Sequence, residues 1–366
     1  MSSYRFERLA TRVGDLPLVN PIICGAGEAV ATESGIRAAL RAGAAGVIAK
    51  SVNEQPAAAR QLDRADYVVL DRDNNPLPWG ADGMSLLNRS GLIQRETVEW
   101  FAGIAAIDRE VAPAGRFVAA SIVLGSGDGA VTIAAAARDA GLRVFELNVG
   151  APHASEATPG AIVNETDPTA LRALVVRIRA ATLGMRLWVK LSGLSVNMPA
   201  LTVAAHEGGA DAVVMMGRFM ALVPDLDSFA PVLGTSAAYG GPWAVPIVCR
   251  FLALSRRAAG PEVPLIGTNG VRAGADVLRM ALCGARAVEV MSVVMQEGFS
   301  AIARIIDELD DYLQPRDLRF ANLVGATADA LASYGDVAER PGHWLGFVPP
   351  ETRESMIGTD TDHEKH

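Results

Sequence analysis

Eight short apolar runs recur along the chain, and they are the feature that most restricts its fold. They read PIICGAG (21–27), GVIAKS (46–51), FVAASIV (117–123), VFELNVG (144–150), LWVKLSG (187–193), DAVVMMG (211–217), PLIGTNG (264–270) and AVEVMSVV (287–294). Their nearly continuous apolarity is typical of parallel strands that are covered on both faces. The sequence therefore predicts eight parallel strands.

Amphipathic helical patterns separate these runs, for example ESGIRAALRAG, DPTALRALVVRIRAAT and AGADVLRMALCG. In the second pattern Asp167 is a suitable N-cap, and Pro168 occupies the first turn. Eight β/α units in about 300 residues fit a single (β/α)8 TIM barrel, because right-handed crossovers in that number close on themselves. A doubly wound open sheet is the alternative.

We predict three parts: an N-terminal hairpin in residues 1–20 that closes the barrel bottom, the barrel in 21–315, and a C-terminal extension in 316–366 with a polar tail. Three connections exceed the usual length, namely residues 52–95, 151–166 and 218–241. They follow strands 2, 4 and 6, so they rise over the face on which such barrels bind ligands. We expect them to act as lids or substrate walls.

Composition excludes several classes of function. The net charge of −8 argues against nucleic acid or an anionic membrane surface as a partner. The N-terminus lacks the apolar region of a secretory signal, and no apolar run reaches the ~20 residues that span a bilayer, so we expect a cytoplasmic protein. Cys24, Cys249 and Cys283 form no CxxC pair, which argues against an iron–sulfur cluster or a structural metal site.

Lysine is rare in this chain, and its positions are informative. Of 33 basic residues only three are lysine, and two of these, Lys50 and Lys190, lie at the ends of predicted strands. Ligands bind at the carboxyl ends of strands in such folds, so two lysines there indicate a pocket for an electron-rich ligand. The alternative is that both are snorkelling or ion-paired lysines in a chain biased toward arginine.

A phosphate site is predicted at the ends of strands 7 and 8. Gly267, Thr268, Asn269 and Gly270 end the seventh strand, and the eighth ends near Ser292. The loops after these two strands are the usual phosphate site of the barrel. A phosphate at one side of the mouth and lysines at the other fit FMN, because a lysine beside its ring stabilises the reduced, anionic form.

The motifs ICGAG, AKS, LNRSGL, ELNVGAPH, VKLSG, GGADAVVM, YGGPWAVPI and PLIGTNGVRAGADVLRMALCGARAVEV occur in a characteristic order. In this order and spacing the chain resembles the dihydroorotate dehydrogenase family, including the flavin domain of dihydropyrimidine dehydrogenases, over residues 14–315. The resemblance implies an FMN site that comprises Ala26, Gly27, Lys50, Ser51, Asn148, Lys190, Gly241, Gly267, Asn269, Gly270, Met291 and Ser292.

The chain departs from this family on the substrate side. Family members protonate or deprotonate a pyrimidine with a cysteine or serine after strand 4, but here Ala151 occupies that position. The same loop offers His153, and histidine is the most capable acid or base near neutral pH. His153 is therefore our candidate catalytic residue, the alternative being that it only hydrogen-bonds the substrate.

The set of asparagines that hold the pyrimidine is also incomplete. Asn88 and Asn148 are present as candidate substrate-binding residues, whereas Gly217 and Arg218 replace an asparagine-containing pair after strand 6. Arg218 is predicted either to bind a substrate carboxylate or to be a solvated loop residue. Tyr239 is a further catalytic candidate, since its phenol can donate a proton, and Lys50 is the third.

These features predict an FMN-dependent oxidoreductase acting on a CH–CH or C=C bond of a small ring, which need not be a pyrimidine. Its electrons would be exchanged with NAD(P)H, O₂ or a partner redox subunit, and we expect a homodimer. Two alternatives stay open: a TIM-barrel lyase or isomerase that uses Lys50 or Lys190, and a flavin-binding protein without dehydrogenase activity.

Overall fold

The computed structural model describes residues 3–150 and 165–356. The chain divides into two compact units, Met1–Asp329 and Ala330–His366. The first unit extends beyond residue 315, where we predicted the barrel to end, because the chain continues through short 3-10 turns and helix α13 (Ala326–Asp329). Arg256 forms an ion pair with Asp329 at the end of this segment.

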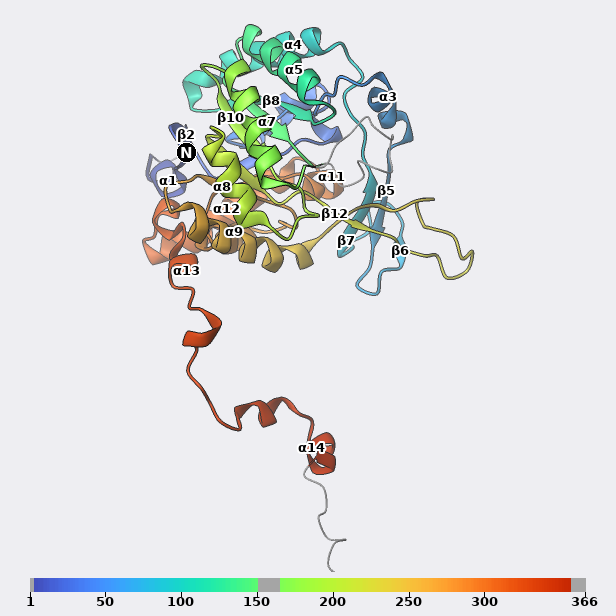
Figure 1. The fold of residues 1–366 in the computed structure, drawn as a ribbon, viewed down its shortest axis with the longest axis vertical. Helices are drawn as coiled ribbons and strands as arrows, with labels where there is room; N and C mark the ends of the chain where they lie inside the picture. Colours follow the sequence, from blue (N-terminus) through green and yellow to red (C-terminus); the bar gives the residue numbers. More distant parts are fainter. Residues whose placement is uncertain (1–2, 151–164, 357–366) are drawn as a thin grey trace, which may run out of the picture. The chain divides into compact units, whose positions relative to one another are not determined.

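The predicted eight parallel strands close into a barrel (Figure 1). In chain order the strands are β3 (Ile22–Cys24), β4 (Gly46–Ile48), β8 (Phe117–Val123), β9 (Val144–Asn148), β10 (Arg186–Lys190), β11 (Ala212–Met215), β14 (Leu265–Thr268) and β15 (Ala285–Val290). Each pairs with its neighbour in sequence order, and β15 pairs with β3 to complete the closure. The TIM barrel is confirmed, and the open sheet is excluded.

Helices surround the barrel as the β/α alternation predicts (Figure 1). They are α2 (Glu33–Arg41), α4 (Thr97–Val111), α5 (Gly127–Asp139), α7 (Pro168–Ala181), α8 (Met198–Glu207), α9 (Val245–Ala259), α10 (Gly274–Leu282) and α12 (Ser300–Leu313). Helix α7 begins as predicted, with Asp167 accepting a hydrogen bond from the Ala170 amide and Pro168 in the first turn.

The lower half of the barrel interior is a separate apolar core. Its members include Ile23, Ile48, Phe117, Trp188 and Ile266, and Phe117 packs edge-on against Trp188 with ring centroids 5.3 Å apart. Three side chains of a hairpin, β1 (Thr11–Val13) and β2 (Leu16–Leu18), belong to the same core. The hairpin therefore plugs the barrel, and helix α1 (Ser3–Leu9) precedes it.

Two of the three long connections form a sheet of their own. Its five antiparallel strands are β12 (Phe219–Ala221), β13 (Ala237–Gly240), β7 (Ser85–Arg89), β5 (Asp66–Leu70) and β6 (Pro76–Leu77), in that spatial order. Residues from the connection after β4 thus pair with residues from the connection after β11, and Ala238 lies opposite Asn88. This sheet fixes the two connections relative to each other at the mouth of the barrel.

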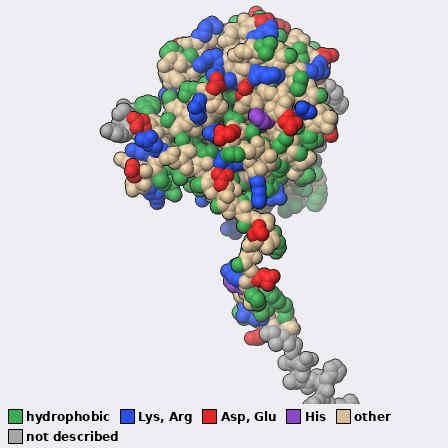
Figure 2. All heavy atoms as spheres, turned by 60° about the vertical axis from the view of Figure 1, so that its left-hand side comes forward, with side chains coloured by type: hydrophobic (Ala, Val, Ile, Leu, Met, Phe, Trp, Pro, Cys, Tyr) green, Lys and Arg blue, Asp and Glu red, His purple; other side chains and the backbone are tan. Residues whose placement is uncertain are grey.

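The second unit contains two short 3-10 turns, at Tyr334–Asp336 and His343–Phe347, and helix α14 (Pro350–Met356). Among the described helices of both units, none is long and apolar enough to cross a membrane. On the face of the first unit that Figure 2 shows, acidic and basic side chains are interspersed.

One buried carboxylate joins α4 to two barrel strands. Asp108 is fully buried and accepts a hydrogen bond from the Val118 amide at 2.8 Å. It also accepts two hydrogen bonds from the Arg143 guanidinium, at 2.8 and 2.7 Å. Arg143 in turn donates to the carbonyl of Arg116. The carboxylate therefore fixes the helix against the start of β8 and the segment before β9.

We expect Asp108→Ala to lower the free energy of unfolding by about 3 kcal/mol, because it leaves a guanidinium and a buried amide without their partner. Urea denaturation followed by circular dichroism measures this change. Asp139→Ala is the matched control, since its ion pair with Arg138 is solvent-exposed and should contribute less than about 0.5 kcal/mol. Equal effects of the two substitutions would contradict the assignment.

Candidate active site

Side-chain alternation along the strands builds a polar layer directly above the apolar core. In a strand, residues two positions apart face the same side. Val144, Trp188 and Ala287 belong to the lower interior core. The residues two positions later on the same strands are Glu146, Lys190 and Glu289, and all three are buried. The apolar floor is therefore followed by a charged layer that faces the barrel axis.

A cavity of about 1110 Å³, counted to its opening, lies above this layer. It is lined by residues from the ends of all eight barrel strands and from β7 and β13 of the five-stranded sheet. They are Gly25, Ala26, Lys50, Ser51, Leu86, Asn88, Ser90, Gly91, Leu92, Val123, Asn148, Gly150, Lys190, Met216, Gly217, Arg218, Gly240, Thr268, Asn269, Gly270, Val271, Glu289, Val290, Met291 and Ser292.

Lys190 sits between two buried carboxylates at the floor of the cavity. Its Nζ donates to Glu146 Oε1 at 3.0 Å and to Glu289 Oε2 at 2.5 Å. Burial alone would lower the pKa of Lys190, but the two carboxylates outweigh it and raise this pKa above its ordinary value. The lysine is therefore held as an ammonium ion.

Lys50 has a carboxylate partner of its own at the side of the cavity. Its Nζ lies 3.1 Å from Glu28 Oε1 and donates to Ser90 Oγ at 2.9 Å. Glu28 Oε1 also accepts hydrogen bonds from Ser90 Oγ at 2.8 Å and from the Gly91 amide at 3.1 Å. Burial lowers the pKa of Lys50, and the Glu28 carboxylate opposes that shift. Glu28 thus occupies donors that would otherwise face the cavity.

Arg218 lies across the cavity and reaches the other long connection. It follows β11, and its guanidinium donates a hydrogen bond to the side-chain oxygen of Asn88 at the end of β7. Three cationic side chains line the cavity among the described residues, and Arg218 is the one that forms no ion pair with a carboxylate there. Its charge acts on Glu28 and Lys50 from a distance, and its remaining donors can meet a ligand.

Two glycine turns approach each other closely at the opposite side of the cavity. Asn269 and Gly270 follow β14 with φ angles of 80° and 87°, the left-handed region that favours glycine. A Cβ atom on Gly270 would lie 2.6 Å from the carbonyl oxygen of Gly241. Helix α10 begins at Gly274, just after this turn, and its first amides are occupied by the Asp276 and Glu308 carboxylates.

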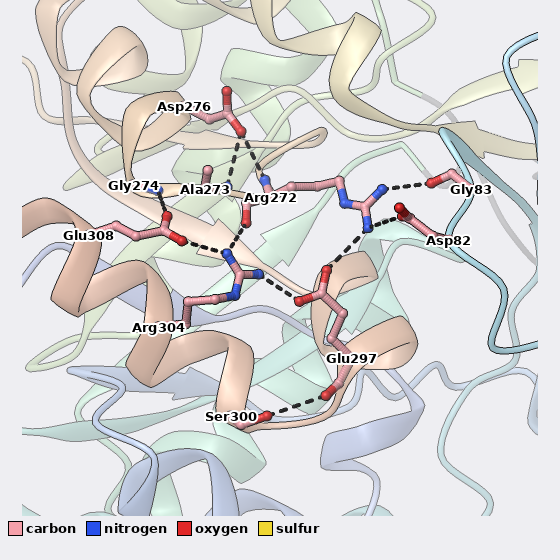
Figure 3. A network of polar contacts seen from close by, with 10 residues as sticks. All are labelled: Asp82, Gly83, Arg272, Ala273, Gly274, Asp276, Glu297, Ser300, Arg304 and Glu308. Carbon is pink, nitrogen blue, oxygen red and sulfur yellow. Dashed lines mark hydrogen bonds and ion pairs between the residues drawn. The ribbon is translucent and has the colours of Figure 1, made fainter.

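A polar network stabilises the turn that follows β14 (Figure 3). The Arg272 side chain donates to the carbonyl of Gly83 at 2.6 Å and to Glu297 at 3.2 Å. Arg304 donates to Glu297 at 2.6 Å and to the carbonyl of Arg272 at 3.1 Å. The network therefore joins the connection after β4 to the segment after β15, and both ends meet at the turn that follows β14.

The structure brings most of the predicted site residues to this cavity. Those that line it are Ala26, Lys50, Ser51, Asn88, Asn148, Lys190, Arg218, Asn269, Gly270, Met291 and Ser292. His153 lies outside the described residues.

Four predicted residues do not line the cavity. Gly27 leaves room for the Met291 side chain, and Gly241 leaves room for the carbonyl of Met84. Gly267 packs against Met280 of α10. The Tyr239 hydroxyl donates to Asn74 at 3.1 Å, contacts Ser85 at 3.2 Å and is separate from the cavity lining. Its ring stacks on Trp243.

Sequence reasoning missed four polar residues of the site: Glu28, Ser90, Glu146 and Glu289. For Glu289 a signal exists, because it is a lone carboxylate inside the apolar run AVEVMSVV and lies at an inward-facing position. Glu28 and Ser90 lie in connections, so no periodicity indicates which way they face. Their contact joins positions 62 residues apart in the chain, and only the fold brings them together.

Comparison with known proteins shows to which family the chain is related. The family model described as dihydroorotate dehydrogenase matches residues 8–313. A catalytic subunit of dihydroorotate dehydrogenase B (NAD(+)) from Methanocella arvoryzae is 27% identical over 319 residues, covering 87% of this chain and 97% of the relative. A dihydroorotate dehydrogenase A (fumarate) from Limosilactobacillus reuteri is 27% identical over 298 residues, covering 78% and 86%. A catalytic subunit of dihydroorotate dehydrogenase B (NAD(+)) from Methanosarcina mazei is 30% identical over 288 residues, covering 76% and 82%.

The Glu28–Lys50 pair predicts how acid affects stability. Burial would raise the pKa of Glu28, but the Lys50 ammonium, with smaller contributions from Tyr67, the Arg218 charge and Ser90, overcomes this and lowers it from 4.5 to about 2. A carboxyl group with a lowered pKa stabilises the fold above the unfolded value and loses that contribution as the pH falls toward the folded value. Stability from this pair should therefore disappear between about pH 4.5 and pH 2.

We expect Glu28→Gln to destabilise the protein by about 3 kcal/mol at pH 7, because a buried ammonium loses its counterion. The difference from wild type should shrink as the pH falls below 4.5. Urea denaturation at several pH values measures both effects. Glu110→Gln, which removes an exposed partner of Arg37, is the control. A difference that stays constant with pH would contradict this explanation.

Proposed function

The chain belongs to the dihydroorotate dehydrogenase family, and we propose that its substrate is a small ring compound that bears a carboxylate and is not a pyrimidine. Membership of the family makes the protein an FMN-dependent oxidoreductase of the dihydroorotate dehydrogenase type. FMN supplies the chemistry of accepting or donating a hydride at its ring.

The cavity fits FMN in shape and in charge. The paired glycine turns bring backbone close to the space that a phosphate would occupy at one side. The charged layer with Lys190 lies at the floor, where a ring can rest against it. We propose that Asn269, Gly270 and Ser292 hold the phosphate, while Lys190 and Asn148 contact the ring.

The free charge of Arg218 carries the substrate assignment. Lys50 and Lys190 are neutralised by carboxylates of the chain itself, whereas Arg218 forms no such pair among the described residues. A guanidinium with open donors binds a carboxylate more favourably than a neutral ring edge. Arg218 also occupies the position at which the family carries an asparagine-containing pair. Arg218 thus favours a substrate with a carboxylate, and loss of the asparagine favours a ring other than a pyrimidine.

The proton that accompanies the hydride needs a group within reach of the substrate. Gly150 lines the cavity, and the loop that begins with Ala151 continues from it. We propose that His153 in this loop moves the proton. Tyr239 is a weaker candidate, because its hydroxyl is bonded to Asn74 and Ser85.

A lyase or isomerase that uses a lysine nucleophile is disfavoured by the contacts of Lys190. Such a nucleophile must be a neutral amine. Two buried carboxylates stabilise the ammonium form instead.

We propose an external electron partner for this enzyme, either NAD(P)H, O₂ or a partner redox subunit, and a homodimer as the assembly. The printed names of the relatives carry NAD(+) and fumarate. Reoxidation of the reduced protein by each acceptor distinguishes the electron partners, and light scattering after size-exclusion chromatography tests the dimer.

Anaerobic mixing of the oxidised protein with a panel of small ring compounds tests the substrate assignment. Loss of the flavin absorbance reports each compound that donates a hydride. Carboxylate-bearing, non-pyrimidine rings should bleach the flavin faster than dihydroorotate or dihydropyrimidines. Rapid bleaching by dihydroorotate would overturn the assignment.

For a substrate found in this way, Arg218→Ala should raise the KM about 10-fold or more, as expected for loss of one charge-assisted hydrogen bond. Arg218→Lys keeps the charge but not the planar fork, so it should recover part of the loss. The matched control is the same substrate scaffold without its carboxylate. An equal change in KM for both compounds would show that Arg218 does not bind the carboxylate.

His153→Asn should keep its flavin and slow flavin reduction by substrate about 10²–10⁴-fold, because asparagine cannot take up the proton. Stopped-flow absorbance measures this rate, and reduction by dithionite controls for an intact flavin site. A rate like that of wild type would leave His153 as a binding residue.

A further inference from the structure

The buried layer at the cavity floor contains one more carboxyl group than it has ammonium groups. Lys190 supplies one positive charge, and Glu146 and Glu289 supply two carboxyl groups. Glu146 is completely buried and Glu289 is 2% exposed. An uncompensated carboxylate in such surroundings is costly, and the usual outcome is that the group takes up a proton instead.

The hydrogen bonds of the two carboxyl groups show where a proton would go. Glu146 Oε1 accepts from Lys190 and from Ser121 Oγ, and Glu289 Oε2 accepts from Lys190. The other oxygen of each group, Glu146 Oε2 and Glu289 Oε1, is buried and has no hydrogen-bond partner in the described structure. Both carboxyl groups bind the same Lys190 Nζ, so they lie beside each other at the cavity floor. One proton taken up by the pair would remove its excess negative charge.

We propose that Lys190, Glu146 and Glu289 form a buried triad that holds one shared proton, and that this proton keeps the floor of the flavin site electrically neutral. With the proton in place, the charges are +1 on Lys190 and −1 on the carboxyl pair. With the proton on Glu289, Glu146 supplies the one negative charge beside Lys190 under the flavin. This consequence depends on the proposed position of the ring, whereas the shared proton does not.

The surroundings favour Glu289 as the site of this proton. Burial, followed by the neighbouring Glu146 charge, raises the pKa of Glu289 well above its ordinary value. Cys24 on the adjacent strand β3 belongs to the outer core that the helices cover, and burial raises the pKa of its thiol to about 12. The thiol therefore stays protonated and contributes no charge. Gly25 leaves room for the carboxyl group, since a Cβ there would lie 3.3 Å from Glu289 Oε2.

Reduction of the flavin couples to this proton. Two electrons and one proton convert the oxidised ring to its reduced anion. If the triad has lost its proton at high pH, the new negative charge beside it favours uptake of one more proton from solvent. Two electrons are then accompanied by two protons rather than one. In the wild-type protein, the midpoint potential of bound FMN should therefore fall more steeply with pH in the range in which the triad of the oxidised protein is deprotonated.

Infrared spectroscopy of the full-length protein tests the shared proton directly. At neutral pH wild type should show the carbonyl stretch of a buried carboxylic acid that shifts in D₂O, with or without FMN bound. Glu289→Gln should lose this band, because one carboxylate then remains to balance Lys190. Glu146→Gln should lose it too, since Glu289 becomes the sole counterion and ionises. A folded wild-type protein without the band, or a band that survives both substitutions, would overturn the proposal.

Redox titration with dithionite against reference dyes tests the consequence for FMN. Glu289→Gln replaces a neutral acid by a neutral amide of the same shape, so its midpoint potential should coincide with that of wild type at every pH at which the acid band is present. A clearly higher potential in the variant at neutral pH would mean that Glu289 is ionised, and would also overturn the proposal. Near-ultraviolet circular dichroism checks that each variant is folded. These measurements need no substrate, so they stand apart from the test of Arg218.

Discussion

Side-chain alternation in a closed parallel barrel is the constraint on which the whole site depends. Every second residue of each strand must point inward, and closure brings the eight strands together around one axis. The lower inward positions are filled by Trp188 and its apolar neighbours, which the hairpin seals from below. The next inward positions carry Glu146, Lys190 and Glu289. A charged floor is thus fixed above a dry core by strand geometry alone.

Burial of charge then decides what the cavity can bind. An ammonium ion in a protein interior needs a counterion, and the chain supplies one for each of its buried lysines. Glu28 holds Lys50 together with Ser90 and the Gly91 amide, and two carboxylates hold Lys190. These contacts stabilise the fold but remove both lysines as free anion-binding groups. The guanidinium of Arg218 consequently becomes the charge that a substrate meets.

The five-stranded sheet gives this arrangement its rigidity. Pairing of β13 with β7 joins two connections that leave the barrel at different strands, and it places Arg218 beside Asn88. On the other side, Arg272 and Arg304 bind Glu297 and the carbonyl of Gly83, which ties the same connection to the proposed phosphate turn (Figure 3). Substrate side and phosphate side are therefore held by one continuous set of contacts. Long connections serve here as structured walls.

The sequence alone determined the barrel, the order of its strands, the hairpin beneath it and eleven of the residues that line the cavity. Apolar periodicity and strand-end position are local properties of the chain. Lys50, Lys190, Asn148 and the glycine turn at 269–270 follow from that reasoning. The partners of the lysines were decided by tertiary structure. Glu28 meets Ser90, and Lys190 meets Glu289, across 62 and 99 positions of sequence. No local pattern encodes such contacts, since burial and charge balance arise only when distant strands and connections close around the same space.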